Sequence, residues 1–179
     1  APGPSAVPSP TQTAPAPAVP AGAFAGQPAL EAALAAVPRG KAVAFGVAVV
    51  DGRTGRRYVS EVGAPYETAS TVKVDILAAT YVRARAAGRG LTATERSLAT
   101  RMIRNSDNDA AQRLFVAAGD RSGLQAFYGR MGMGSTRSFA TWGLTTTTPS
   151  DRMVLHQAVE AGNGVLRDED GEEILELMR

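Results

Sequence analysis

The stretch ASTVKVDIL, residues 69–77, places a serine and a lysine three positions apart at the start of an apolar, helix-like run. Residues at positions i and i+3 share one face of a helix, so the amine of Lys73 can reach the hydroxyl of Ser70. A serine at a helix N-terminus also lies in a positive potential, beside backbone N–H groups that can bind an oxyanion. Burial and nearby cations can lower the pKa of a lysine enough for it to accept a proton. Ser-x-x-Lys therefore contains the parts of an activated nucleophile, although a solvated helix lysine is the simpler explanation of this spacing alone.

The composition limits which chemistry is possible. Cysteine is absent, which excludes a disulfide scaffold, a cysteine–zinc site and a cysteine nucleophile. His156 is the single histidine, so a multi-histidine metal site is excluded and lysine becomes the leading candidate base for an activated serine. The basic residues are scattered and the net charge is only +2, so we expect no nucleic-acid partner. We also expect no cofactor, no metal and, without a run of 18 apolar residues, no membrane-spanning helix.

The first 22 residues differ from the rest of the chain. They consist almost entirely of Pro, Ala, Ser, Thr, Gly and Val, and such a segment cannot bury enough apolar surface to offset its ordering entropy. We predict a disordered Pro/Ala-rich tether over residues 1–22 and one folded domain over residues 23–179. The chain starts at Ala1 rather than methionine, which is consistent with a removed leader. A tether of this kind suits a bacterial extracytoplasmic protein, secreted or associated with the cell surface or cell wall.

The pattern of apolar residues predicts a helix, a hairpin and then about six helices. An alanine-rich helical stripe covers 27–37, and two short apolar segments with a glycine-containing turn between them predict strands over 42–50 and 56–62. The first long helix after the hairpin is expected over 70–87, and the segment 133–147 is expected to be irregular. A two-stranded hairpin is not a stable sheet by itself, so it must pack on helices or pair with further strands.

A second polar motif, RNSDNDA, occupies residues 104–110. Ser, Asp and Asn are ordinary helix-capping residues, and capping alone explains one of them. Here five such residues follow one another from Asn105 to Asp109, so the surplus polar groups could face a cleft. Trp142 and Phe139, in the irregular segment, are expected to pack that loop rather than to line a substrate groove.

Ser-x-x-Lys at the start of one helix and Ser-Asp-Asn at the start of a later one resemble the penicillin-recognising serine hydrolases, which include the class A β-lactamases and the penicillin-binding D,D-peptidases. The resemblance covers roughly residues 24–179, an N-terminal portion of such a domain. It implies a β-lactamase/transpeptidase-like α/β (α+β) fold, with a helical subdomain beside an antiparallel sheet whose C-terminal strands are not in this chain. The supporting segments are YETASTVKVDILAATY (66–81), LTATERSLATRMIRNSDNDAAQRLF (91–115) and LTTTTPSD (144–151).

The resemblance also implies roles for individual residues. Ser70 would attack the substrate carbonyl and become acylated, with Lys73 as the base, directly or through water. Ser106 would relay a proton to the leaving nitrogen, and Asn108 would hydrogen-bond Lys73 and the substrate amide. Asp107 would have a structural role in fixing the loop. The implied substrate is a β-lactam or a peptidoglycan-type D-alanyl peptide.

The sequence departs from this pattern in two places. No Asp or Glu lies between Asp120 and Asp151, where class A β-lactamases carry the glutamate that activates the deacylating water, so we expect slow deacylation. The third motif, Lys-Thr-Gly, is also missing, so its strands were removed, lie on a second chain or never existed. The leading hypothesis is a secreted serine hydrolase that forms an acyl-enzyme. The alternatives are a catalytically inactive cell-wall binding module that kept the pocket, and a helical domain in which the motifs coincide by chance.

Overall fold

The computed structural model describes residues 26–37, 45–61 and 64–179. The predicted tether lies outside these residues, and the single domain over 23–179 stays a prediction. Among the described residues, six α-helices follow the hairpin, as the sequence predicts. The elements are α1 (Gln27–Ala36), β1 (Val47–Val50), β2 (Arg57–Ser60), β3 (Tyr66–Glu67), η1 (Ala69–Thr71), α2 (Val72–Ala86), α3 (Ala93–Arg104), α4 (Asn108–Ala117), α5 (Asp120–Met131), η2 (Trp142–Leu144), β4 (Thr146–Thr147), α6 (Pro149–Ala161) and α7 (Asp168–Met178), where η denotes a short 3₁₀ helix.

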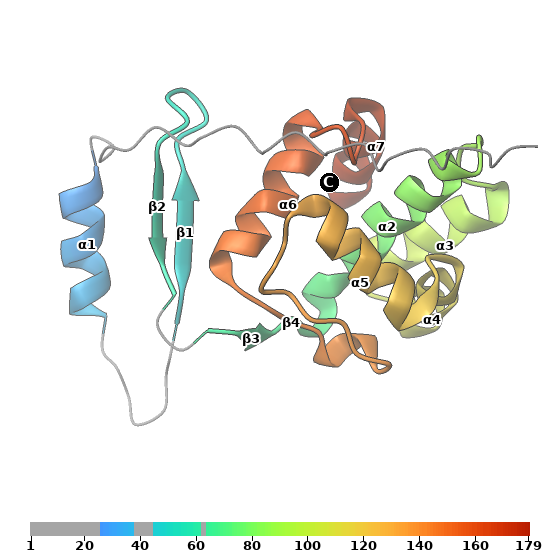
Figure 1. Ribbon diagram of the computed structural model, residues 1–179, viewed down its shortest axis with the longest axis horizontal. Coiled ribbons are helices and arrows are strands. Elements are labelled where there is room, and N and C mark those ends of the chain that lie inside the picture. The colour runs from blue at the N-terminus through green and yellow to red at the C-terminus, as the bar shows by residue number, and fades with distance from the viewer. Residues whose placement is uncertain (1–25, 38–44, 62–63) are drawn as a thin grey trace, which may run out of the picture.

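The predicted hairpin is present, and it packs on a helix. β1 and β2 pair antiparallel, from Val47 opposite Ser60 to Val50 opposite Arg57. The described strands are shorter than predicted, and residues 42–44 and 62 lie outside the described part of the chain. β1 lies against α6, at the end of the molecule away from α3 and α4 (Figure 1). Gly46 allows this close approach, because a Cβ there would stand only 2.5 Å from Cγ of Pro149.

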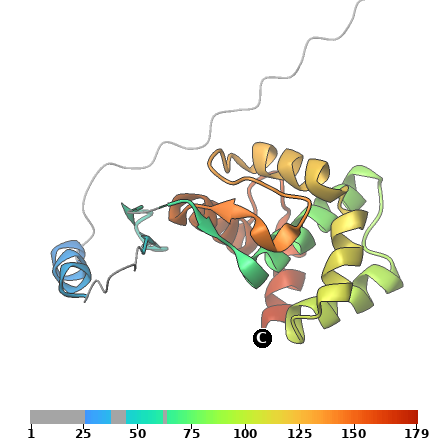
Figure 2. The same cartoon turned by 90° about the horizontal axis from the view of Figure 1, so that it is seen from below.

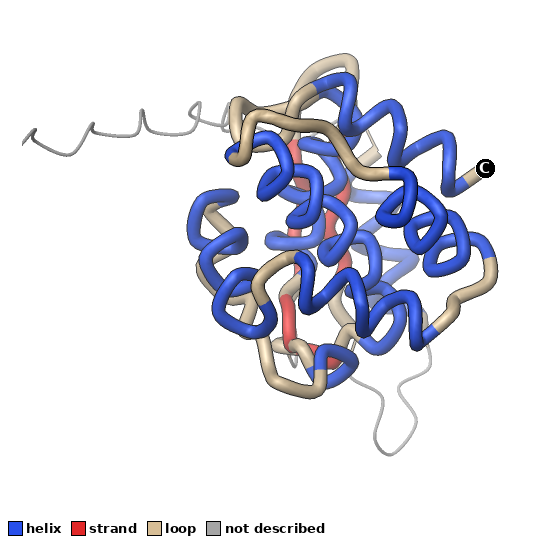
Figure 3. Tube along the Cα trace, turned by 90° about the vertical axis from the view of Figure 1, so that its right-hand side faces the viewer, coloured by secondary structure: helices blue, strands red, loops and turns tan. Residues whose placement is uncertain are grey.

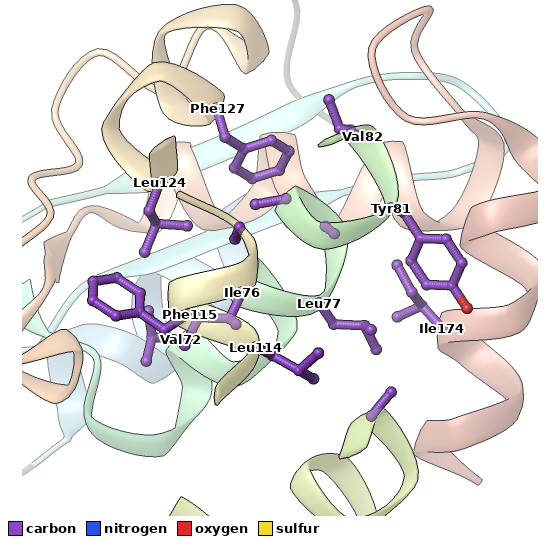
Figure 4. Close-up of a cluster of buried hydrophobic side chains, with 14 of the residues drawn as sticks. Val72, Ile76, Leu77, Tyr81, Val82, Leu114, Phe115, Leu124, Phe127 and Ile174 are labelled. Carbon is purple, nitrogen blue, oxygen red and sulfur yellow. The ribbon is translucent and has the colours of Figure 1, made fainter. Parts of the chain in front are cut away.

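Helix α2 is the centre of the hydrophobic core. It packs against α4, α5 and α7, and its apolar side chains are buried on several sides. Figure 4 shows Ile76 and Leu77 of this helix meeting Leu114 of α4, with Ile174 of α7 on the far side. Helices α3, α4, α5 and α7 surround it. The helices form the bulk of the molecule, with the strands of the hairpin behind them in the view of Figure 3. No helix in the described ranges combines the length and apolarity needed to cross a bilayer.

Side-chain caps fix where the surrounding helices begin. At α3 Thr92 and Glu95 form a complete capping box: Thr92 Oγ1 accepts from the Glu95 N–H at 3.2 Å, and Glu95 Oε2 accepts from the Thr92 N–H at 2.7 Å. At α6 the cap is Thr148, which accepts from the Asp151 N–H. These local bonds satisfy backbone donors that helix geometry leaves free.

The segment 133–147, expected to be irregular, contributes one strand to a second small sheet. β4 pairs antiparallel with β3, with Tyr66 opposite Thr147 and Glu67 opposite Thr146 (Figure 2). Each strand has only two residues, too few for an alternating pattern to be visible in the sequence. Asp151 fastens the loop that leads into β4, because its carboxylate accepts bonds from the Ser135 N–H at 2.9 Å and from Thr136 Oγ1 at 2.7 Å.

Candidate active site

Ser70 lies in the turn of 3₁₀ helix that leads into α2, not in the α-helix itself. The helix predicted over 70–87 begins as η1 and becomes α-helical at Val72. The ladder of β3 and β4 continues into this turn through a bond from the Thr68 N–H to the Thr145 carbonyl at 2.8 Å. Ala69 has a φ of 44°, in the left-handed region that non-glycine residues seldom adopt. The nucleophile candidate is thus held in a strained and tethered turn.

Lys73 lies one turn further along and is surrounded by oxygen atoms. Its Nζ is 3.3 Å from Ser70 Oγ, 2.8 Å from Ser106 Oγ, 2.6 Å from the Ser106 carbonyl oxygen and 2.9 Å from Asn108 Oδ1. The Ser106 hydroxyl also donates to Ser70 Oγ at 3.3 Å. Lys73 is only 3% exposed, whereas Ser70, Ser106 and Asn108 are exposed. Hydrogen bonds therefore connect the buried Lys73 amine to the hydroxyls of two exposed serines.

The polar motif at 104–110 supplies these partners because it forms the corner between α3 and α4. Asp107 is the N-cap of α4 and accepts from the Ala110 N–H at 2.9 Å. Its other oxygen accepts from Arg101 Nε at 2.9 Å, which ties the corner back to α3. Ser106 has a φ of 52°, a second left-handed non-glycine residue beside the site. This conformation aims both the carbonyl and the hydroxyl of Ser106 at Lys73.

An open cavity of about 510 Å³ adjoins the two serines. It is lined by Ser70, Lys73 and Ser106, by apolar side chains of α2, α3 and the end of α7, and by two arginines. Arg104 and Arg179 are those arginines, and the lining contains no acidic side chain. A molecule bound in the cavity would therefore meet the Ser70 hydroxyl, apolar side chains and two positively charged arginines.

Burial changes the acid–base behaviour of the amine. Removal from water disfavours the charged form and holds the pKa of Lys73 below its usual value, while the negative charge of Asp107 acts in the opposite direction. A lowered pKa increases the fraction of neutral amine at neutral pH. That fraction can accept the Ser70 proton, as a general base must.

Trp142 of η2 also faces the amine, which the sequence did not indicate. Lys73 Nζ is 5.3 Å from the centroid of the indole ring, within the range of a cation–π contact. The ring is oriented by its N–H, which donates to Gln112 Oε1 at 3.1 Å. The sequence predicts that Trp142 packs the loop, and its contact with Lys73 adds a second role. Phe139 of the same loop is 42% exposed.

The structure thus brings all four predicted site residues together: Ser70, Lys73, Ser106 and Asn108. His156 is not among them, because it lines a separate cavity between β1 and α6. No group of three or more His, Cys, Asp or Glu residues that could hold a metal ion occurs among the described residues. The catalytic roles themselves stay predictions.

Solved structures show which fold this is, whereas the sequence comparisons match nothing. No protein-family profile matches the chain, and no curated protein does so. The chain is similar to the class A β-lactamase of the last common ancestor of Gram-negative bacteria, with a TM-score of 0.63 and 25% identity over 74% of this chain and 63% of that one. It is also similar to a β-lactamase from Streptosporangium roseum, with a TM-score of 0.62 and 22% identity, and to one from Xanthomonas campestris, with a TM-score of 0.63 and 21% identity. Both matches cover 74% of this chain and 62% of the other.

The described chain therefore has a partial class A β-lactamase-like fold, as the sequence motifs predicted. It spans about 62% of the length of the structures it matches. At 21% and 22% identity, the two natural enzymes support the fold alone. Nothing in these comparisons supports the expectation of a second chain that supplies further strands.

Proposed function

We propose that the protein is a serine hydrolase that forms an acyl-enzyme on Ser70 with β-lactams or D-alanyl peptides. The observation that carries this proposal is the environment of Lys73. A buried amine with a lowered pKa lies within hydrogen-bonding distance of Ser70 Oγ and Ser106 Oγ. Similarity to class A β-lactamases at 25% identity supports the superfamily, and the substrate class follows from that similarity.

The proposed acylation uses the hydrogen bonds described above. Neutral Lys73 takes the proton of the Ser70 hydroxyl, and Ser70 Oγ attacks the carbonyl carbon of the substrate. When the carbon–nitrogen bond breaks, the Ser106 hydroxyl protonates the leaving nitrogen and is reprotonated by Lys73, 2.8 Å away. The Ser70 N–H, at the start of the helical turn, is a donor for the carbonyl oxygen as negative charge develops on it. The product is an ester on Ser70 with an amine released or, for a cyclic substrate, retained.

A penicillin-type probe and an intact-mass measurement test this proposal. We expect a covalent adduct on the wild-type protein that is absent from Ser70→Ala and strongly reduced in Lys73→Met. Ser97→Ala, an exposed serine on α3, is the matched control and should form the adduct normally. A folded wild-type protein that gains no mass from the probe or from a D-alanyl thioester would contradict the proposal.

A binding module without turnover is the second candidate, and one observation favours it. Residues 121–150 contain no carboxylate side chain, so the loop that carries Trp142 offers no acidic base to water. In that case the same probes would bind saturably and reversibly, with no change of mass. We also propose an extracytoplasmic location, supported by the Pro/Ala-rich composition of residues 1–22, and cell fractionation of the producing bacterium would test it.

A further inference from the structure

Lys73 helps to line the open cavity, and away from that cavity the space around its amine is filled. Four oxygen atoms lie within 3.3 Å of Nζ, more than the three hydrogens of an ammonium group can serve at once. The indole ring of Trp142 adds an apolar cover 5.3 Å from the same nitrogen. The amine is therefore placed to exchange protons with Ser70 and Ser106, and outside the cavity these contacts leave no room for a water molecule beside it.

Two elements keep the indole ring in this place. Asn108 and Gln112 lie one turn apart on α4, so they share a face of that helix. Asn108 binds the amine, and Gln112 accepts the indole N–H. On the other side, η2 packs against η1, the turn that carries Ser70. The indole ring is thus held between α4 and the turn that carries the nucleophile.

The ring covers the amine from outside the open cavity. Within the described part of the chain, the cavity beside Ser70 is lined by residues of η1, α2, α3, the α3–α4 corner and the end of α7, and Trp142 is not one of them. A substrate that enters this cavity meets the two serines without displacing the indole. Trp142 can therefore leave acylation intact while it affects a later step.

We propose that Trp142 prolongs the life of the acyl-enzyme by occupying the space beside Lys73 that a hydrolytic water would need. This inference rests on the proposed function. In deacylation, a water oxygen attacks the ester carbon on Ser70 and gives one proton to neutral Lys73; the bond to Ser70 Oγ then breaks, and Lys73 returns that proton to the serine. Lys73 is the nearest base among the described residues. The acyl group occupies the cavity side of this amine, and the indole ring covers the approach outside the cavity, so water is kept from the base.

The test compares formation and loss of the adduct in matched variants. Wild-type protein, Trp142→Ala, Trp142→Phe and the same-loop control Phe139→Ala are acylated with a penicillin-type probe, freed of excess probe, and followed by intact mass. We expect Trp142→Ala to lose the adduct at least about tenfold faster than the wild type. A positioned general base accelerates a reaction roughly 10²–10⁴-fold, so this expected change is a small part of that effect. Trp142→Phe, which keeps a ring, and Phe139→Ala should stay near the wild-type rate, and the acylation rate should change little in all four.

Each outcome decides one question. Equal or slower adduct loss in Trp142→Ala overturns the inference and leaves the proposed function standing. A parallel fall in acylation and adduct loss shows that Trp142 is merely structural, and it also overturns the inference. No adduct on wild-type protein ends the proposed function itself. If Trp142→Ala does not fold, Gln112→Met, which removes the acceptor of the indole N–H, takes its place and should accelerate loss in the same direction.

Discussion

Substitution of Arg152 by methionine should destabilise the protein strongly, although Arg152 lies on α6 and outside the candidate site. Its guanidinium donates to both carboxylate oxygens of Asp75 on α2, at 2.6 and 2.7 Å. Asp75 is completely buried, and its remaining side-chain partner is the hydroxyl of Tyr128, 2.8 Å away. Methionine would fill most of the volume of the arginine but leave a carboxylate in the core without a countercharge.

The magnitude follows from this burial. The arginine side chain is 16% exposed and the aspartate 0%, so solvent screening reduces the ion pair little. Removal of one partner of a buried pair costs about 3–5 kcal/mol. In a domain of this size that loss corresponds to a fall in the melting temperature of roughly 6–20 °C. Arg130→Met, an exposed arginine on α5, is the matched control and should change the free energy of unfolding by less than about 0.5 kcal/mol.

The pH dependence distinguishes an unpaired charge from simple loss of packing. Burial raises the pKa of Asp75, and the Arg152 guanidinium opposes that effect. Without the guanidinium, the folded state holds a proton on Asp75 more readily than the unfolded state does. The free energy of unfolding therefore falls as pH rises from the unfolded pKa of Asp75 to its raised folded pKa. The deficit of Arg152→Met, measured by chemical denaturation, should therefore be smaller near pH 5 than near pH 8. A deficit that is equal at both values, or no larger than that of Arg130→Met, would refute the reasoning.

Three further predictions concern charged groups whose pKa the fold shifts. Because only neutral Lys73 can accept a proton and its pKa is lowered, the acylation rate should rise with pH and level off below the usual pKa of lysine; a flat profile in stopped-flow acylation would argue against Lys73 as the base. Asp107→Asn removes a charge that raises this pKa but keeps a good helix cap, so the rise should move to lower pH, with less than about 1 kcal/mol of destabilisation by urea titration. The bond from Arg89 and the cap bonds of Thr92 lower the pKa of Glu95 to about 2, so the stability that Glu95 contributes is present above pH 4.5 and lost towards pH 2. Glu95→Gln should lack this contribution at every pH when thermal unfolding is measured. An acid transition equal to that of the wild type would contradict the prediction.

Features that depend on neighbouring residues were predictable from the sequence. The capping box of α3 needs only Thr92 and Glu95, and the hairpin needs two apolar segments and a turn. The spacing of Ser70 and Lys73 predicts that their side chains share one face. The second polar motif, at residues 104–110, then suggests that the surplus polar groups face a cleft. Each of these features is fixed by bonds or periodicities that span only a few residues.

Features that depend on distant partners were not predictable in this way. The pairing of β3 with β4 joins residues about eighty positions apart through two residues on each side. The partner of Asp75 is Arg152, seventy-seven positions away, and neither residue carries a local signal of the other. A single sequence shows that a charge lies in an apolar run, but the partner that makes its burial tolerable is chosen by the packing of α6 against the core.

Trp142 is the most informative of these cases. In the sequence it is an aromatic residue in a loop without acidic side chains, and loop packing explains it fully. Its position over Lys73 arises because β4 docks on β3 and draws η2 against η1, while Gln112 of α4 fixes the ring. The lack of a carboxylate in this loop and the presence of an indole beside the amine then act in the same direction, since one removes a base and the other excludes the water. A slow acyl-enzyme would thus follow from what the loop contains as well as from what it lacks.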